Sequence, residues 1–188
     1  MKMNRQFEVE LRSENENTCE GLACVFNRET DIGWFTEEID AHAFDETDMS
    51  DVVLLFNHNE NLVLAGTRNG SLELSVENTG LFQKSQIINT TTGEDVMKLV
   101  REGLINKMSF AFSVSEDGEE WENRNGKEHR IIKKIKKLYD VSLVTRPAYD
   151  QTFAYARNDE LAQKHLDELK RKKQDEKMEE LLNGKSTM

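Results

Sequence analysis

Short runs of alternating apolar and polar residues constrain the fold of this chain more than any other feature. In residues 7–11 and 72–76 every second residue is apolar, which places the apolar side chains on one face of a strand. Residues 52–56 are apolar throughout, and the run is short enough for a buried strand. Residues 110–114 repeat the alternation. We therefore expect short strands to dominate as far as residue 157.

A turn and a helix divide these strands. Asn125-Gly126 suits a two-residue hairpin turn, because both residues tolerate positive φ. It would join a strand around Trp121 to a basic strand over residues 127–137, and a last strand would follow over residues 139–145. Residues 91–94 (TTGE) resemble a capping box, after which Val96, Leu99 and Val100 form an apolar stripe that ends before Gly103.

Short strands with one or two inserted helices predict the α+β class. The same pattern suggests a mainly antiparallel β-barrel, closed or nearly closed, with a few peripheral helices.

The composition changes after Arg157. Residues 158–183 contain no proline or glycine, and Lys, Glu, Asp, Leu and Gln dominate them. The leucines are too sparse for a sustained coiled-coil seam, and such a charge run favours a solvated face over a specific binding site. We therefore divide the chain into a domain at residues 1–157 and a charged extension at residues 158–188. The extension is expected to be a helix, or to be disordered until assembly.

The composition argues against several functions. A net charge of -11 opposes binding to a nucleic-acid backbone. No apolar run approaches the roughly 18 residues of a membrane span, and the first residues lack a signal peptide's apolar stretch, so we expect a soluble intracellular protein. Cys19 and Cys24 are five residues apart in an extended segment, which would place them on opposite faces and prevent a disulfide. Two cysteines and four scattered histidines do not suggest a metal site, and no cofactor is expected.

One serine and one histidine occupy positions suited to catalysis. His58 follows the apolar run, and strand parity places it on the face of residues 52, 54 and 56. Ser109 has large neighbours that face away from it, and its own face carries only Ala111 and Ser113, which leaves room for a substrate backbone. Histidine can activate a serine hydroxyl near neutral pH. The same residue types also fit a structural histidine and an ordinary strand serine, since such a pair is recognised by geometry.

A series of short blocks between Gly21 and Arg157 resembles, in order, the prohead maturation proteases of tailed bacteriophages. The blocks are residues 21–27 (GLACVFN), 37–39 (EEI) with 43–44 (AF), 55–59 (LFNHN), 80–81 (GL), 99–103 (LVREG), 108–112 (MSFAF) and 141–149 (VSLVTRPAY).

This resemblance implies a fold similar to the herpesvirus assembly proteases, a β-barrel ringed by helices. Their catalytic serine and histidine fall on Ser109 and His58. Asp140 stands where those enzymes have a second histidine, and there it could accept a hydrogen bond from the imidazole and fix its tautomer. A strand-start aspartate that caps a turn is an equally open interpretation of Asp140. Resemblance also places an oxyanion donor in the loop at Arg146, a residue that could equally be a surface cation.

The implied function is that of a serine endopeptidase of phage capsid maturation, acting through an acyl-enzyme. Its expected partners and substrates are the scaffold protein and the major capsid protein, with the protease itself as a further candidate substrate. It would act in the host bacterial cytoplasm inside the assembling procapsid. Since the herpesvirus enzymes are dimers, resemblance also suggests a homo-oligomer.

Two other functions stay open at this point. A non-catalytic assembly module would bind capsid or scaffold protein, and it predicts that Ser109 and His58 lie far apart. A hydrolase of small esters would work as a monomer without any capsid protein.

Overall fold

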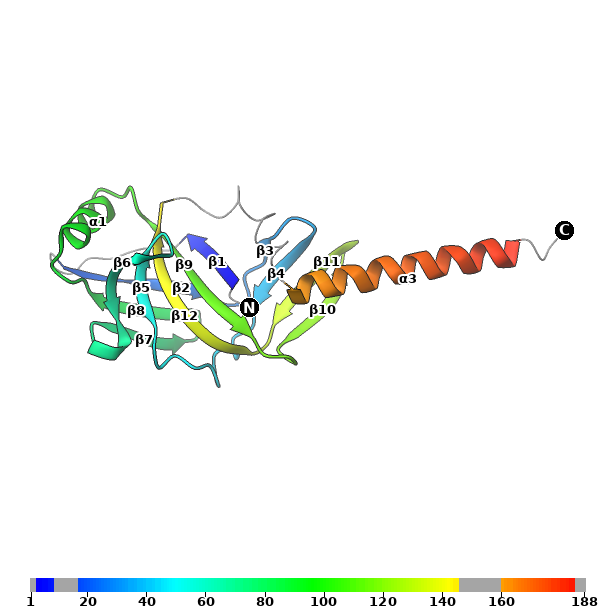
Figure 1. Cartoon of the computed structure of the whole chain (residues 1–188), viewed down its shortest axis with the longest axis horizontal. Helices are drawn as coiled ribbons and strands as arrows, with labels where there is room; N and C mark the ends of the chain where they lie inside the picture. The colour runs from blue at the N-terminus through cyan, green and yellow to red at the C-terminus, as the bar shows by residue number, and fades with distance from the viewer. Residues whose placement is uncertain (1–2, 9–16, 146–159, 185–188) are drawn as a thin grey trace.

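A computed structural model describes residues 3–8, 17–145 and 160–184 of the 188-residue chain (Figure 1). These residues form strands, one short 3-10 helix, η1 (Thr67–Asn69), and two α-helices, α1 (Thr91–Arg101) and α3 (Glu160–Gly184). The strands are β1 (Met3–Glu8), β2 (Thr18–Val25), β3 (Thr30–Asp31), β4 (Phe35–Ile39), β5 (Val53–Phe56), β6 (Asn59–Gly66), β7 (Leu72–Glu77), β8 (Gly80–Gln86), β9 (Lys107–Val114), β10 (Glu119–Arg124), β11 (Lys127–Ile132) and β12 (Ile135–Val144).

The strands form three separate sheets. Their orders are β1-β9-β12-β5-β6, β10-β11-β4-β3 and β2-β8-β7. Most neighbours are antiparallel, but β12 pairs with β5 and β11 with β4 in parallel. The α+β class is confirmed, whereas the closed or nearly closed barrel is wrong, since no sheet of the described residues closes on itself. Alternation of apolar residues specifies which face of a strand is buried, but it does not specify which strand lies beside it.

One large hydrophobic core joins the three sheets and α1. Phe110 and Phe112 of β9 stack at 4.9 Å between ring centroids, and Phe44 lies 6.1 Å from Phe110. Helix α1 buries its predicted stripe, including Val96 and Val100, in the same core. Its N-cap is Thr90, one residue before the predicted capping box, and the Thr90 hydroxyl accepts a hydrogen bond from the Gly93 N–H at 3.1 Å.

The basic segment at residues 127–137 is not the single strand that its composition suggested. The predicted hairpin turn is present, with positive φ at Asn125 (54°) and Gly126 (86°) between β10 and β11. The segment then breaks, because the N–H groups of Lys133 and Lys134 both donate to the Gly118 carbonyl, at 2.8 and 3.1 Å. A Cβ on Gly118 would lie 2.4 Å from the Lys134 oxygen, so only glycine allows this approach. After the break, β12 continues in a different sheet.

Both cysteines lie in the hydrophobic core as free thiols. The prediction that they face opposite sides of a strand is wrong, because β2 carries a register shift between Leu22 and Cys24. Cys19 pairs with Ser85 and Cys24 with Leu81, two residues that lie four apart on β8 and so share a face.

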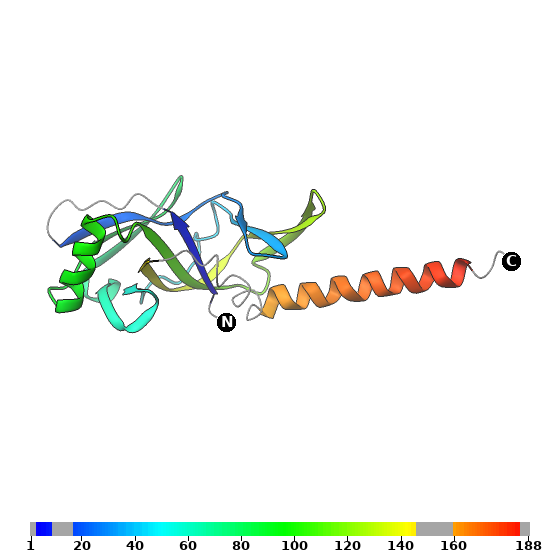
Figure 2. The same cartoon turned by 90° about the horizontal axis from the view of Figure 1, so that it is seen from above.

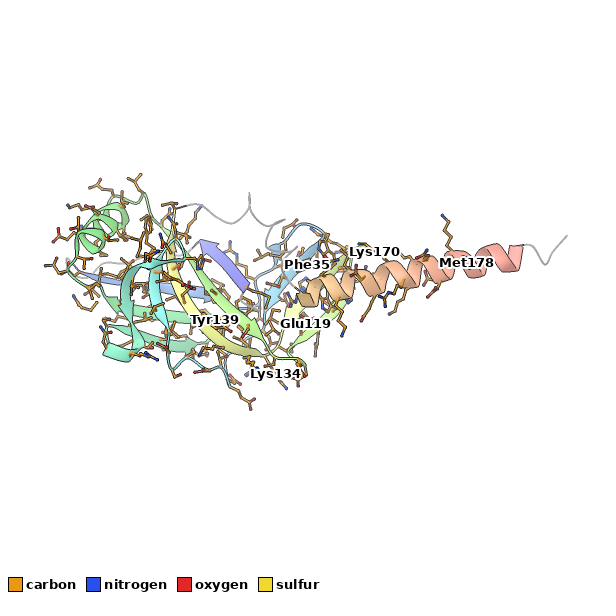
Figure 3. All side chains as sticks on the ribbon, in the orientation of Figure 1. Phe35, Glu119, Lys134, Tyr139, Lys170 and Met178 are labelled. Carbon is orange, nitrogen blue, oxygen red and sulfur yellow. The ribbon has the colours of Figure 1, made fainter. Side chains whose placement is uncertain are left out.

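Helix α3 begins at the four-stranded sheet and projects away from the strands, as both views show (Figures 1 and 2). Its first turns pack on that sheet, where Ala162 is buried against Ile32 and Phe35. The His165 ring stacks on Trp121 with centroids 4.1 Å apart. Residues 170–178 of the helix are exposed, and Figure 3 labels Lys170 and Met178 on this part. The predicted boundary at residue 157 lies outside the described residues, and neither described α-helix is long and apolar enough to cross a membrane.

Candidate active site

Strand β9 carries Ser109 and lies in the five-stranded sheet between the edge strand β1 and the central strand β12. The predicted split of its faces is confirmed, since Phe110 and Phe112 belong to the core while Ser109 points to the other side. Ser109 pairs directly with Ser142 of β12, and Ala111 pairs with Asp140. Residues paired across neighbouring strands share a face, so Ser109, Asp140 and Ser142 lie on the same face of the sheet.

His58 reaches this face from the turn between β5 and β6. Asn57 and His58 both have positive φ, at 53° and 56°, while Phe56 pairs with Asn59. This is the two-residue hairpin in which both central residues are left-handed, a conformation that asparagine and histidine tolerate better than most residues. The prediction that His58 lies on the face of residues 52, 54 and 56 is wrong, because strand alternation stops at the turn.

The His58 ring contacts both of the other predicted catalytic residues. His58 Nε2 lies 2.6 Å from Ser109 Oγ, and His58 Nδ1 lies 2.6 Å from Asp140 Oδ1. An ionised carboxylate only accepts hydrogen bonds, so the proton belongs on Nδ1 and Nε2 is left to accept the serine proton. Ser109 and Asp140 are fully buried, whereas 13% of the His58 side chain is exposed. The non-catalytic module required Ser109 and His58 to be far apart, and they are in hydrogen-bond contact.

Strand β12 also fixes the turn that carries His58. The Asn57 N–H donates to the Leu143 carbonyl at 2.9 Å, and the Thr145 N–H donates to the Asn57 side-chain oxygen at 3.1 Å. The His58 N–H donates to Ser142 Oγ at 3.3 Å. Neither Asn57 nor Ser142 was singled out from the sequence, although an asparagine beside His58 is a signal for a left-handed turn.

Two other features of the site were considered in the sequence. Arg146, the expected oxyanion residue, lies outside the described residues. Within the described ranges, no three or more His, Cys, Asp and Glu side chains gather as a metal site would require.

A serine that contacts a histidine, which in turn contacts a buried aspartate, is the arrangement of serine hydrolases. The chain belongs to the caudovirus prohead serine proteases, because the model of that family matches residues 5–167. The solved structure of the bacteriophage T4 capsid assembly protease, gp21, is similar to this chain with a TM-score of 0.49 and 9% identity, and the match covers 78% of this chain and 98% of that one. No curated protein sequence matches the chain. The prediction of a phage prohead protease is therefore confirmed at the level of the family.

Proposed function

We propose that the protein is a serine endopeptidase in which Ser109 is the nucleophile, His58 the general base and Asp140 the residue that orients the base. The observation that carries this proposal is the pair of 2.6 Å contacts through which the His58 ring bridges Ser109 and Asp140. Contacts of this length lie within the roughly 2.6–3.2 Å over which a base can take a proton directly.

The proposed reaction is acyl transfer in two halves. His58 Nε2 takes the proton of Ser109 as Oγ attacks the peptide carbonyl carbon, and Asp140 stabilises the imidazolium that forms. The imidazolium then protonates the leaving amine, so the C–N bond breaks and an acyl-enzyme remains. Water attacks the ester carbonyl while His58 takes its proton. His58 then returns that proton to Ser109 Oγ as the ester C–O bond breaks and the carboxylic acid product leaves. Backbone donors must stabilise the oxyanion in both halves, and we place one of them in the loop at Arg146 by resemblance.

The proposed substrates are the phage scaffold and major capsid proteins, together with the protease itself. Membership of the prohead serine protease family supports this choice, since the prohead is the assembly that contains these proteins. We propose a protease domain at residues 1–157 and an extension at residues 158–188. The projecting helix α3 gives the extension a large exposed surface for contact with assembly proteins, and we propose that the enzyme acts as a homo-oligomer.

A fluorophosphonate probe tests the nucleophile without knowledge of the substrate. Because Ser109 is buried, the protein must open locally before any reagent reaches Oγ. The reaction is therefore measured on two samples, the free protein and assemblies formed by co-expression with the capsid and scaffold proteins. We expect the intact chain to gain the mass of one phosphonyl group, and capsid or scaffold protein to be cleaved. Ser109→Ala should abolish both results.

The matched control is Ser85→Ala, which also removes a buried strand serine but lies in the separate β2-β8-β7 sheet. This variant should react and cleave like the wild type. Normal cleavage by Ser109→Ala would remove Ser109 as the nucleophile. Rapid turnover of small esters without any cleavage of capsid proteins would instead favour the small-ester hydrolase.

A further inference from the structure

We propose that Ser142 is a positioning residue of this site, which holds the Asp140 carboxylate and the His58 turn in one fixed arrangement. The inference rests on the proposed catalytic roles of Ser109, His58 and Asp140, and it adds Ser142 to these three residues. Ser142 would act through its hydroxyl on the two residues that prepare the nucleophile, without contact to the substrate.

Three contacts converge on the Ser142 hydroxyl. Its proton is donated to Asp140 Oδ1 at 2.9 Å, the same oxygen that accepts from His58 Nδ1. Its oxygen accepts from the His58 backbone N–H at 3.3 Å and lies 3.1 Å from His58 Nδ1. One buried hydroxyl therefore touches both the side chain and the backbone of the proposed base, and also the carboxylate that orients it.

The sheet leaves Ser142 little freedom to move. It lies two residues after Asp140 on β12, and strand alternation puts both side chains on one face. On one side Ser142 pairs with Ser109 of β9, and on the other it pairs with Leu55 of β5, in the strand that leads into the His58 turn. Because β12 has a strand on each side and Ser142 is fully buried, its hydroxyl is held where these three contacts meet.

These contacts supply two things that the site needs. A buried carboxylate is favoured as an anion when it accepts hydrogen bonds, and only the anion keeps the proton of His58 on Nδ1. The left-handed backbone of His58 is unfavourable for a residue other than glycine, so it needs bonds that hold it in place. Ser142 donates a hydrogen bond to the Asp140 carboxylate and accepts one from the His58 backbone N–H. Its removal should therefore loosen the ring against both Ser109 and Asp140.

The test compares Ser142→Ala with Ser85→Ala, the buried strand serine outside the site whose hydroxyl donates to the Cys19 carbonyl at 2.9 Å. In Ser142→Ala we expect the rate of phosphonylation of Ser109 to fall about tenfold. A fall of this size is expected when the transition state loses the net contribution of about one hydrogen bond. Ser85→Ala should keep the wild-type rate. The low-field NMR resonance of the His58 Nδ1 proton should shift or broaden only in Ser142→Ala.

A double-mutant cycle shows whether Ser142 acts through Asp140. In an Asp140→Asn background the oriented imidazole is already lost. Adding Ser142→Ala there should lower the rate by less than about twofold, because residues that work as one unit are strongly non-additive. If Ser142 contributes only to packing, the full loss will appear in both backgrounds. That result would overturn the proposal.

Should Ser142→Ala fail to fold, Ser142→Thr and Ser142→Val provide the comparison, since threonine and valine share a shape and only threonine keeps the hydroxyl. The threonine variant should react faster than the valine variant, and equal rates would overturn the proposal. Failure of the wild type to react at all would remove the proposed function itself. A reactive wild type with an equally reactive Ser142→Ala would leave that function standing and remove only the role of Ser142.

Discussion

Arg130 of β11 is a charged side chain that the fold buries completely. Its guanidinium pairs with Glu37 at 3.1 Å and with Glu119, to which its Nε donates at 2.8 Å. It also lies 5.6 Å from the centre of the Trp121 ring. The proposed perturbation is Arg130→Met, which keeps much of the side-chain volume and removes the charge.

The expected loss follows from the burial of the acidic partner. Glu37 is only 2% exposed, so Arg130→Met leaves a carboxylate in the interior after its cation has gone. Removing one partner of a buried pair costs about 3–5 kcal/mol in the free energy of unfolding. For a chain of this size each kcal/mol corresponds to roughly 2–4 °C in Tm, which gives a fall of about 6–20 °C.

Arg124 of β10 is the matched control. It contacts three carboxylates, those of Glu29, Glu38 and Glu122, but 37% of its side chain is exposed. Exposed pairs are screened by water and salt and contribute about 0–1 kcal/mol, so Arg124→Met should lower Tm by no more than about 4 °C. If the number of ion pairs decided stability, Arg124→Met would be the more destabilising of the two variants, because Arg124 contacts more carboxylates than Arg130.

Thermal and urea unfolding of the purified variants measure both effects. A second variant, Arg130→Met with Glu37→Gln, should recover part of the loss, because a neutral amide is less costly to bury than a carboxylate. If Arg124→Met proves as destabilising as Arg130→Met, burial does not decide the strength of these pairs and the reasoning fails.

Two further predictions concern the site and the thiols. Asp140→Asn should lower the rate constant for peptide cleavage by about 10⁴-fold, because an amide can donate to His58 Nδ1 and favour the wrong tautomer. Single-turnover cleavage of capsid precursor measures this rate constant. A loss below about tenfold would rule out the orienting role of Asp140. Burial raises the pKa of Cys19 to about 12 and raises the pKa of Cys24 well above its usual value, so both thiols are protonated at pH 8. Both should therefore resist iodoacetamide until the protein is unfolded, and mass spectrometry of the treated protein measures this.

Local patterns in the sequence determined much of the secondary structure. The apolar stripe of α1, the Asn125-Gly126 turn and the two faces of β9 each depend on residues that are close along the chain. For the same reason the sequence could place Ser109 on the face away from the core. The choice of His58 and Asp140 as its partners came from resemblance to a family, and their catalytic roles stay predictions.

Tertiary structure alone decided what meets at the site. His58 is 51 residues from Ser109 and 82 from Asp140 along the chain, so their contacts depend on how β5, β9 and β12 pair. The division into three sheets and the position of Ser142 beside His58 depend on the same pairing. Alternation of apolar residues specifies which face of a strand is buried. Which strands pair with one another depends on the packing of the whole core, and no local sequence pattern specifies it.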